Sequence, residues 1–250
     1  PRGLFRIRYK CRAGFETGRT HAWIGDWRLE QDGDLYRAEV RGEGFAYALS
    51  LVPDRPPLLN GLAGFSTKAP DPRHASYYYS RPQLSVAGSV TVAGQMQRVA
   101  GRAWLDHEWS SELLPEGAQG WDWVGLNFDD GSALMAFRLR DADNLPLWSA
   151  ATFRQAAGAS TTFPPQAVSF EPLRHWRSPR TGISFPVAWR LRVGQREFEV
   201  QALLDDQELD SRRSTGAIYW EGAVRLIEAG REIGRGYLEM TGYGERIRVG

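Results

Sequence analysis

Cysteine is almost absent from this sequence, because Cys11 is the only one among 250 residues. A single cysteine cannot close a disulfide within the chain, so the fold does not depend on one, and cysteine use does not reveal the redox compartment. Long apolar runs are absent as well, and no segment is long enough to cross a bilayer as a hydrophobic helix.

The sequence also lacks an excess of charge of either sign. It carries 31 Lys and Arg against 30 Asp and Glu, which gives a formal net charge of +1. Proteins that bind nucleic acids neutralise phosphates with a basic excess, so we expect no nucleic-acid partner. The chain opens at Pro1, without an initiator Met or an apolar signal segment, and we therefore expect a leader or an N-terminal piece to be missing.

Aromatic residues and turn formers are abundant instead. Aromatics make up 12% of the chain, and 27 Gly and 14 Pro mark frequent turns, a composition that favours strands over helices. Because no amphipathic helix of ordinary length is evident, the sequence predicts an all-β protein, and barrels in preference to open sheets. Alternation of apolar and polar residues predicts antiparallel strands at residues 5–10, 35–40, 45–50, 84–90, 121–128, 133–140, 189–193, 196–203, 219–226 and 236–243.

The segments between these runs contain the residues that hairpins need. Residues 31–34 and 41–44 supply flexible glycines, and 129–131 place an Asp-Gly turn between two apolar runs. Residues 230–236 lack the strand–helix context of a phosphate loop, so we interpret them as a hairpin, and residues 155–165 as a mobile polar loop.

One stretch interrupts the strand pattern and predicts a domain boundary. Residues 110–120 separate two aromatic-rich parts of the chain. We therefore expect an N-terminal β domain at residues 1–112 and a C-terminal β domain at residues 113–250.

The densest cluster of reactive side chains is Asp106-His107-Glu108-Trp109. In an extended strand, Trp104, Asp106 and Glu108 would share one face, whereas His107 and Trp109 would share the other. A turn at His107 would bring all of them together, and the sequence does not choose between the two. The structural interpretation is that the acids pair with nearby Arg while the indoles fill a core.

Other chemistries have weaker support. His107 has no His at helical spacing, and His21, His74 and His175 are scattered, so we expect neither a metal site nor a cofactor. No Gly-x-Ser-x-Gly motif is present to support a serine hydrolase.

Aromatic residues beside this cluster are candidates for the wall of a ligand pocket, although such rings commonly fill the cores of small barrels. These candidates are Tyr78, Trp104, Trp121 and Trp123. Asp122 lies between two indoles in the sequence, and desolvation by them would raise its pKa and suit it to act as an acid.

An ordered series of motifs gives the chain a family resemblance. The series comprises Tyr78-Tyr79-Ser80-Arg81-Pro82, residues 104–109, Gly120-Trp121-Asp122-Trp123, residues 219–222 and residues 236–243. Together these resemble the AttH and carotenoid 1,2-hydratase family. The resemblance implies two lipocalin-like antiparallel β-barrels packed side by side. The family's N-terminal Glu-Trp-Trp-Tyr type motif has no counterpart here, so we expect the first domain to lack its first strands.

The resemblance also implies a hydro-lyase-like activity on a long apolar isoprenoid or lipid. Adding water to a C=C bond requires a proton donor, a stabilised cation and a positioned water, and we assign these to Asp106, Trp109 and His107. The His-x-Trp pair matches the family's active segment, and Glu108 and Asp122 are alternative acids.

Two other functions stay open. The chain could be a non-catalytic exported carrier of a hydrophobic ligand that serves a transport system, or a structural module with packed barrels. Family resemblance favours an exported, periplasmic or membrane-associated location, with a membrane or transporter as partner.

Overall fold

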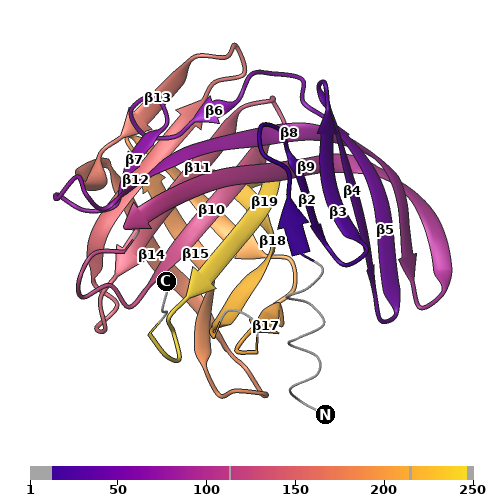
Figure 1. Cartoon of the computed structure of the whole chain (residues 1–250). Helices are drawn as coiled ribbons and strands as arrows, with labels where there is room; N and C mark the ends of the chain where they lie inside the picture. Colours follow the sequence, from indigo (N-terminus) through magenta and orange to yellow (C-terminus); the bar gives the residue numbers. More distant parts are fainter. Residues whose placement is uncertain (1–12, 113, 214–215, 247–250) are drawn as a thin grey trace. The chain divides into compact units, whose positions relative to one another are not determined.

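The computed structural model describes residues 13–112, 114–213 and 216–246 (Figure 1). Within these ranges the chain forms strands and one short 3₁₀ helix, so the predicted all-β class is confirmed. None of the described helical structure is long and apolar enough to cross a membrane. The strand predicted at residues 5–10 lies outside the described residues, as does Cys11.

The first half of the chain forms one antiparallel sheet. Its strands follow the order β1-β2-β3-β4-β5-β8-β6, with β7 and β9 also paired to β8. Figure 1 shows β8 and β9 running beside each other as the two longest strands. The bounds are β1 Ala13–Phe15, β2 His21–Ile24, β3 Trp27–Asp32, β4 Leu35–Gly42, β5 Phe45–Val52, β6 Leu58–Leu59, β7 Phe65–Thr67, β8 Ala75–Val92 and β9 Gln95–Glu112.

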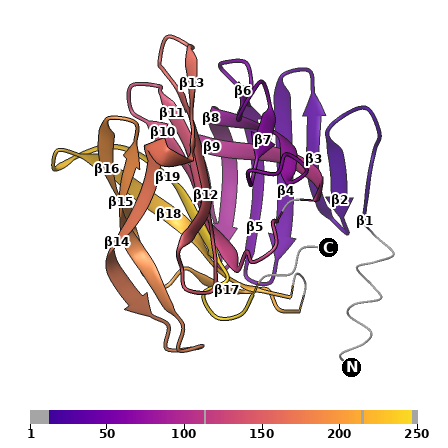
Figure 2. The ribbon, with the colours of Figure 1, turned by 90° about the vertical axis from the view of Figure 1, so that its left-hand side faces the viewer.

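The second half forms another antiparallel sheet, in the order β13-β12-β11-β10-β19-β18-β16-β15-β14, with β17 paired to β18. Figure 2 shows β14, β15 and β16 in this sequence along the sheet. The bounds are β10 Gly120–Phe128, β11 Ala133–Arg140, β12 Pro146–Arg154, β13 Ser160–Phe163, η1 Pro165–Ala167, β14 Val168–Arg177, β15 Ser184–Val193, β16 Arg196–Ala202, β17 Glu208–Asp210, β18 Ile218–Glu228 and β19 Arg231–Thr241.

The predicted turns adopt the backbone that their glycines permit. Gly33, Gly44 and Gly131 have positive φ angles of 57°, 78° and 88°, so each sits where an L side chain would be strained. The predicted hairpin near Gly230 joins β18 to β19. The segment expected to be a mobile polar loop differs, because residues 160–163 pair with β12 as β13.

The chain divides into two compact units, and β8 and β9 contribute to both. One unit comprises Pro1–Pro56 and Gln83–Ala103, and the other comprises Pro57–Pro82 and Trp104–Gly250. Within β8 the change of unit falls between Pro82, which cannot donate to the strand ladder, and Gln83, which has a φ of 60°. The domain boundary at residue 112 stays a prediction.

The larger unit has apolar side chains on both faces of its central strands, β10 and β11. Every residue of β11 is buried, although alternate side chains point to opposite faces. One face, with Leu134 and Ala136, belongs to the main core around Trp189 and Trp220. The other face forms a second apolar cluster, composed of Tyr78, Met135, Phe137 and Leu139 with the partly buried Trp104, Trp121, Trp123 and Trp148.

Asp122 points into the main-core face of β10, where it forms a buried ion cluster. Its Oδ2 accepts Nε–H bonds from Arg138 at 2.6 Å and from Arg140 at 2.9 Å, and its Oδ1 accepts the Tyr243 hydroxyl at 2.9 Å. Asp122 and Arg140 are fully buried. The carboxylate therefore neutralises two buried guanidinium groups.

We expect Asp122→Asn to lower the free energy of unfolding by about 3–5 kcal/mol, because two buried arginines lose their counter-charge. Urea unfolding followed by tryptophan fluorescence measures the change. The control is Asp210→Asn, which removes an exposed carboxylate paired with Arg212 and should leave the transition midpoint unchanged. Equal midpoints for both variants would contradict the structural role of Asp122.

Candidate functional site

Strand β9 stays extended through the segment Asp106-His107-Glu108-Trp109, so there is no turn at His107. Asp106 accepts a bond from Tyr78, whereas His107 contacts the next residue along β8, Tyr79. Since alternate side chains point to opposite faces, the structure separates the Asp106 carboxylate from His107 and Trp109.

The Asp106 carboxylate accepts hydrogen bonds from three side chains. The Tyr78 hydroxyl donates to Oδ2 at 2.6 Å, and the Ser80 hydroxyl donates to Oδ1 at 2.6 Å. The Trp104 indole N–H donates to Oδ1 at 2.7 Å. All three donors belong to β8 and β9, which pair with each other.

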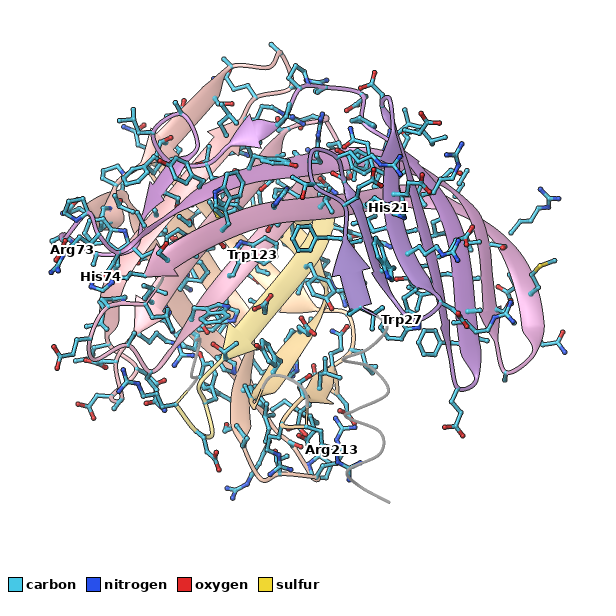
Figure 3. The ribbon with its side chains drawn as sticks, viewed as in Figure 1. His21, Trp27, Arg73, His74, Trp123 and Arg213 are labelled. Carbon is cyan, nitrogen blue, oxygen red and sulfur yellow. The ribbon has the colours of Figure 1, made fainter. Side chains whose placement is uncertain are left out.

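The hydroxyl donors are themselves oriented by groups behind them. The indole N–H of Trp123, which Figure 3 labels on β10, donates to the Tyr78 oxygen at 2.8 Å. The amide of Asn60 donates to the Ser80 oxygen at 2.8 Å. An indole N–H can only donate, so the Tyr78 oxygen accepts a hydrogen bond from Trp123 and the Tyr78 hydroxyl proton is directed at Asp106.

Burial raises the pKa of Asp106 to about 6, although its three hydrogen-bond donors work in the opposite direction. Burial also raises the pKa of Tyr78 well above its usual value, so this phenol stays neutral and keeps a proton to donate. Although its carboxyl group is buried enough to shift the pKa, Asp106 taken over all its atoms is an exposed residue of β9, and solvent can reach this strand. An accessible carboxyl that changes charge near neutral pH is suited to proton transfer.

Gly125 allows the Trp104 indole to lie close to β10. A Cβ atom at this position would lie 2.8 Å from Cε2 and 2.9 Å from Cδ2 of Trp104, which is too close for any side chain. The Trp104 and Trp123 rings meet edge to face, with centroids 6.1 Å apart. The glycine therefore helps to fix the indole that donates to Asp106.

Glu108 lies on the same face of β9 and pairs with a buried lysine. Lys68 Nζ is 2.8 Å from Glu108 Oε1, which also accepts the Ser76 hydroxyl at 2.5 Å. The lysine lies over the Phe137 ring, 4.1 Å from its centroid, and burial lowers its pKa. This pair closes one side of the second apolar cluster with charges that satisfy each other.

A second carboxyl with a raised pKa faces this cluster from β19. Glu239 is the register partner of Trp123, so the two side chains share a face, and Glu239 Oε1 accepts the Trp121 indole N–H at 2.8 Å. Its pKa is raised to about 7, mainly by burial; the Trp121 bond works in the opposite direction, and the charges of Glu221, Asp106 and Glu108 contribute to the rise. Glu221, the register partner of Glu239 on β18, also has a pKa raised by burial.

The opposite face of β8 and β9 carries an exposed row of rings. His107 lies between Tyr79 and Trp109, with ring centroids 5.2 Å and 5.1 Å away. Trp109 stacks on Tyr77 at 5.6 Å, and both are more than half exposed.

The structure thus brings together six of the predicted site residues and leaves three apart. Those brought together are Tyr78, Trp104, Asp106, Glu108, Trp121 and Trp123. His107 and Trp109 lie on the other face of β9, and Asp122 points into the main core. Among the described residues, no group of His, Cys, Asp or Glu is arranged to hold a metal ion.

Glu239, Ser80 and Lys68 were missed as site residues by the sequence argument. Glu239 lies in a predicted strand and Ser80 in a family motif, but no local pattern signals the contacts that they make with Trp121 and Asp106. Only strand pairing over more than a hundred residues places Glu239 beside Trp121 and Trp123.

The fold and the site define an all-β protein with two antiparallel sheets and a carboxyl–indole cluster beside one of them. The AttH-like family model matches residues 5–243, and the chain belongs to this family. This confirms the resemblance seen in the sequence motifs. No curated protein matches the chain in sequence.

Two solved structures share the fold. One is described as an AttH from Nitrosomonas europaea: it is 48% identical, with a TM-score of 0.88, and the match covers 92% of this chain and 72% of that one. The other is kievitone hydratase from Nectria haematococca, 18% identical with a TM-score of 0.70, and the match covers 88% of this chain and 69% of that one. At this identity the second match shows a common fold alone.

We expect Trp104→Phe to raise the pKa of Asp106 above about 6, because the carboxylate loses a donor that stabilises its charged form. Carbon-13 NMR of the side-chain carboxyls across a pH titration measures this shift. Trp148→Phe is the control, since Trp148 packs in the same apolar cluster without donating to Asp106. An unchanged Asp106 titration in Trp104→Phe would show that the indole bond is not formed.

The raised pKa values also predict how stability depends on pH. Folded Glu239 holds its proton up to about pH 7, whereas the unfolded side chain releases it near 4.5, so the free energy of unfolding falls as pH rises through this window. Glu239→Gln should flatten that fall in urea titrations at pH 4.5 to 7. Glu232→Gln, on the exposed end of β19, should keep the wild-type slope. A slope unaffected by Glu239→Gln would contradict the raised pKa.

Proposed function

We propose that this protein adds water to a C=C bond of a long apolar isoprenoid or lipid by acid catalysis. The observation that carries the proposal is the Asp106 carboxyl, which has a pKa of about 6 and lies on an exposed strand among aromatic side chains. Such a group can exchange a proton at neutral pH beside a surface that binds hydrocarbon.

Hydration of an isolated alkene sets three demands. A proton must reach the less substituted carbon, a tertiary cation must survive briefly, and water must attack from a defined side and lose a proton. Carboxyls meet the first and last demands. Indole faces meet the second, because their electron-rich surface attracts cations.

The indoles of Trp104 and Trp123 are better placed for this role than Trp109. Trp104 contacts Asp106 directly, and Trp123 contacts it through Tyr78. His107 and Trp109 would have to act from the other face of β9, so in this proposal they do not contact the reacting carbons.

A carrier function is the second candidate, and a cavity in the smaller unit favours it. This cavity has a volume of about 320 Å³ and is lined by His21, Trp23, Gly25 and Arg28, with His21 labelled in Figure 3. Its lining contains no carboxyl group. A pocket of this size and lining can hold part of an apolar molecule without changing it.

We expect Asp106→Asn to reduce hydration of an acyclic carotenoid end group at least about 100-fold, because the carboxyl that handles protons is lost. Mass spectrometry of protein incubated with acyclic carotenoids and with lipid extracts measures the products and the bound molecules. Asp210→Asn serves as the exposed control, and circular dichroism checks that each variant is folded. Hydration retained in Asp106→Asn would sink the assignment, and unchanged bound lipid with no product from the wild-type protein would favour the carrier.

A further inference from the structure

The hydrogen bonds around Asp106 favour its ionised form. Trp104 can only donate, so the Oδ1 atom that it contacts must accept. Tyr78 and Ser80 receive bonds from Trp123 and Asn60, which leaves their own protons directed at the carboxylate. Three donated hydrogen bonds therefore stabilise the charged form of the Asp106 carboxyl.

Donors from the described residues leave one acceptor position on Asp106 open. A carboxylate offers about four lone-pair positions, and two on Oδ1 and one on Oδ2 are used by the three donors. The remaining position, on Oδ2, can accept a proton from a water molecule. Asp106 therefore has the arrangement of a base.

Glu239 has the opposite arrangement. Within the described residues, Trp121 is the one side chain that donates to it, and that bond occupies Oε1 alone. Its other oxygen can carry a proton. Glu221 is its direct cross-strand partner on β18, and like charges at this spacing repel each other.

We propose that Glu239 is the proton donor of this site, and that Asp106 is the base that takes a proton from the attacking water. This assignment rests on the proposed hydratase function and reverses the role first given to Asp106. The order of the pKa values, about 7 for Glu239 and about 6 for Asp106, agrees with it.

The two carboxyls balance the reaction. Glu239 gives its proton to the less substituted alkene carbon, the π electrons form the C–H bond, and the other carbon becomes a cation. Water forms the C–O bond with that cation and loses a proton to Asp106. Solvent then removes the proton from Asp106 and restores the one on Glu239, so the net change is the addition of one water.

The charges of Glu221, Asp106 and Glu108 raise the pKa of Glu239, and further ionisable groups belong to the same site. The acidic and phenolic groups of the site are Asp106 and Glu108 on β9, Glu221 on β18, Tyr237 on β19 and Tyr78 on β8, and the cation is Lys68. Burial raises the pKa of Tyr237 to about 12, so this phenol stays neutral. Activity should therefore peak between about pH 6 and 7, since it requires ionised Asp106 and protonated Glu239.

Deuterium exchange separates the two roles. In D₂O, the Asp106→Asn variant keeps its deuterium donor, so the cation still forms. The cation then loses a proton and returns to an alkene that carries deuterium. Hydration by this variant should fall at least about 100-fold, because the base is missing. Glu239→Gln keeps the Trp121 bond but has no proton to give, so it should yield neither hydrated product nor deuterated alkene. Deuterium incorporation by Glu239→Gln would overturn the assignment, and so would its loss from Asp106→Asn.

Which of the two carboxyls has the higher pKa can be tested even if no alkene is hydrated. Carbon-13 NMR of the ligand-free protein should show the highest-titrating carboxyl disappear in Glu239→Gln and remain in Glu232→Gln. If that resonance disappears in Asp106→Asn instead, the assignment fails. If Glu239 has the higher pKa in the wild-type protein but no hydrated product forms, the hydratase function is refuted while the order of the two pKa values stands.

Discussion

Burial of the second face of β10 and β11 is the constraint on which the site depends. The first face of these strands packs into the main core around Trp189 and Trp220. The second face is covered as well, by Tyr78 and Trp104 with the indoles of β10. A carboxyl that lies there loses hydration, and both raised pKa values at the site have burial as their largest cause.

The larger unit holds its carboxyl groups in two different environments. Asp122 faces two arginines and a tyrosine, so its charge is compensated and it serves the structure. Among the described residues, Asp106 on β9 and Glu239 on β19 accept side-chain hydrogen bonds from neutral donors only. Neutral donors orient a carboxyl without supplying a counter-charge, so its protonation state can change near neutral pH. The contrast distinguishes a structural acid from a reactive one better than burial alone.

Much of this arrangement was predictable from local sequence patterns. The strand predicted over residues 133–140 matches β11 residue for residue. For residues 104–109 the sequence left an extended strand and a turn at His107 both open, and the structure shows the strand. The Asp-Gly turn at 129–131 and the family motifs also follow from short stretches of chain. These features depend on local backbone preferences, which the sequence displays directly.

The rest depends on pairing between distant strands. Asp122 stands between two indoles in the sequence, yet β-strand alternation turns it away from them toward Arg138 and Arg140. Glu239 gains its role from Trp121, 118 positions away, and no local pattern signals that contact. Likewise, the polar sequence of residues 160–163 suggests a loop, but these residues pair with β12 as strand β13.

The central claim is that this carboxyl–indole cluster adds water to an alkene. The most direct measurement is incubation of the protein with an acyclic isoprenoid in ¹⁸O-labelled water, followed by mass spectrometry and NMR of the product. The account predicts one ¹⁸O atom on the tertiary carbon and one solvent-derived hydrogen on its neighbour. Recovery of unlabelled isoprenoid from a folded protein that has bound it at pH 6 to 7 would contradict the claim.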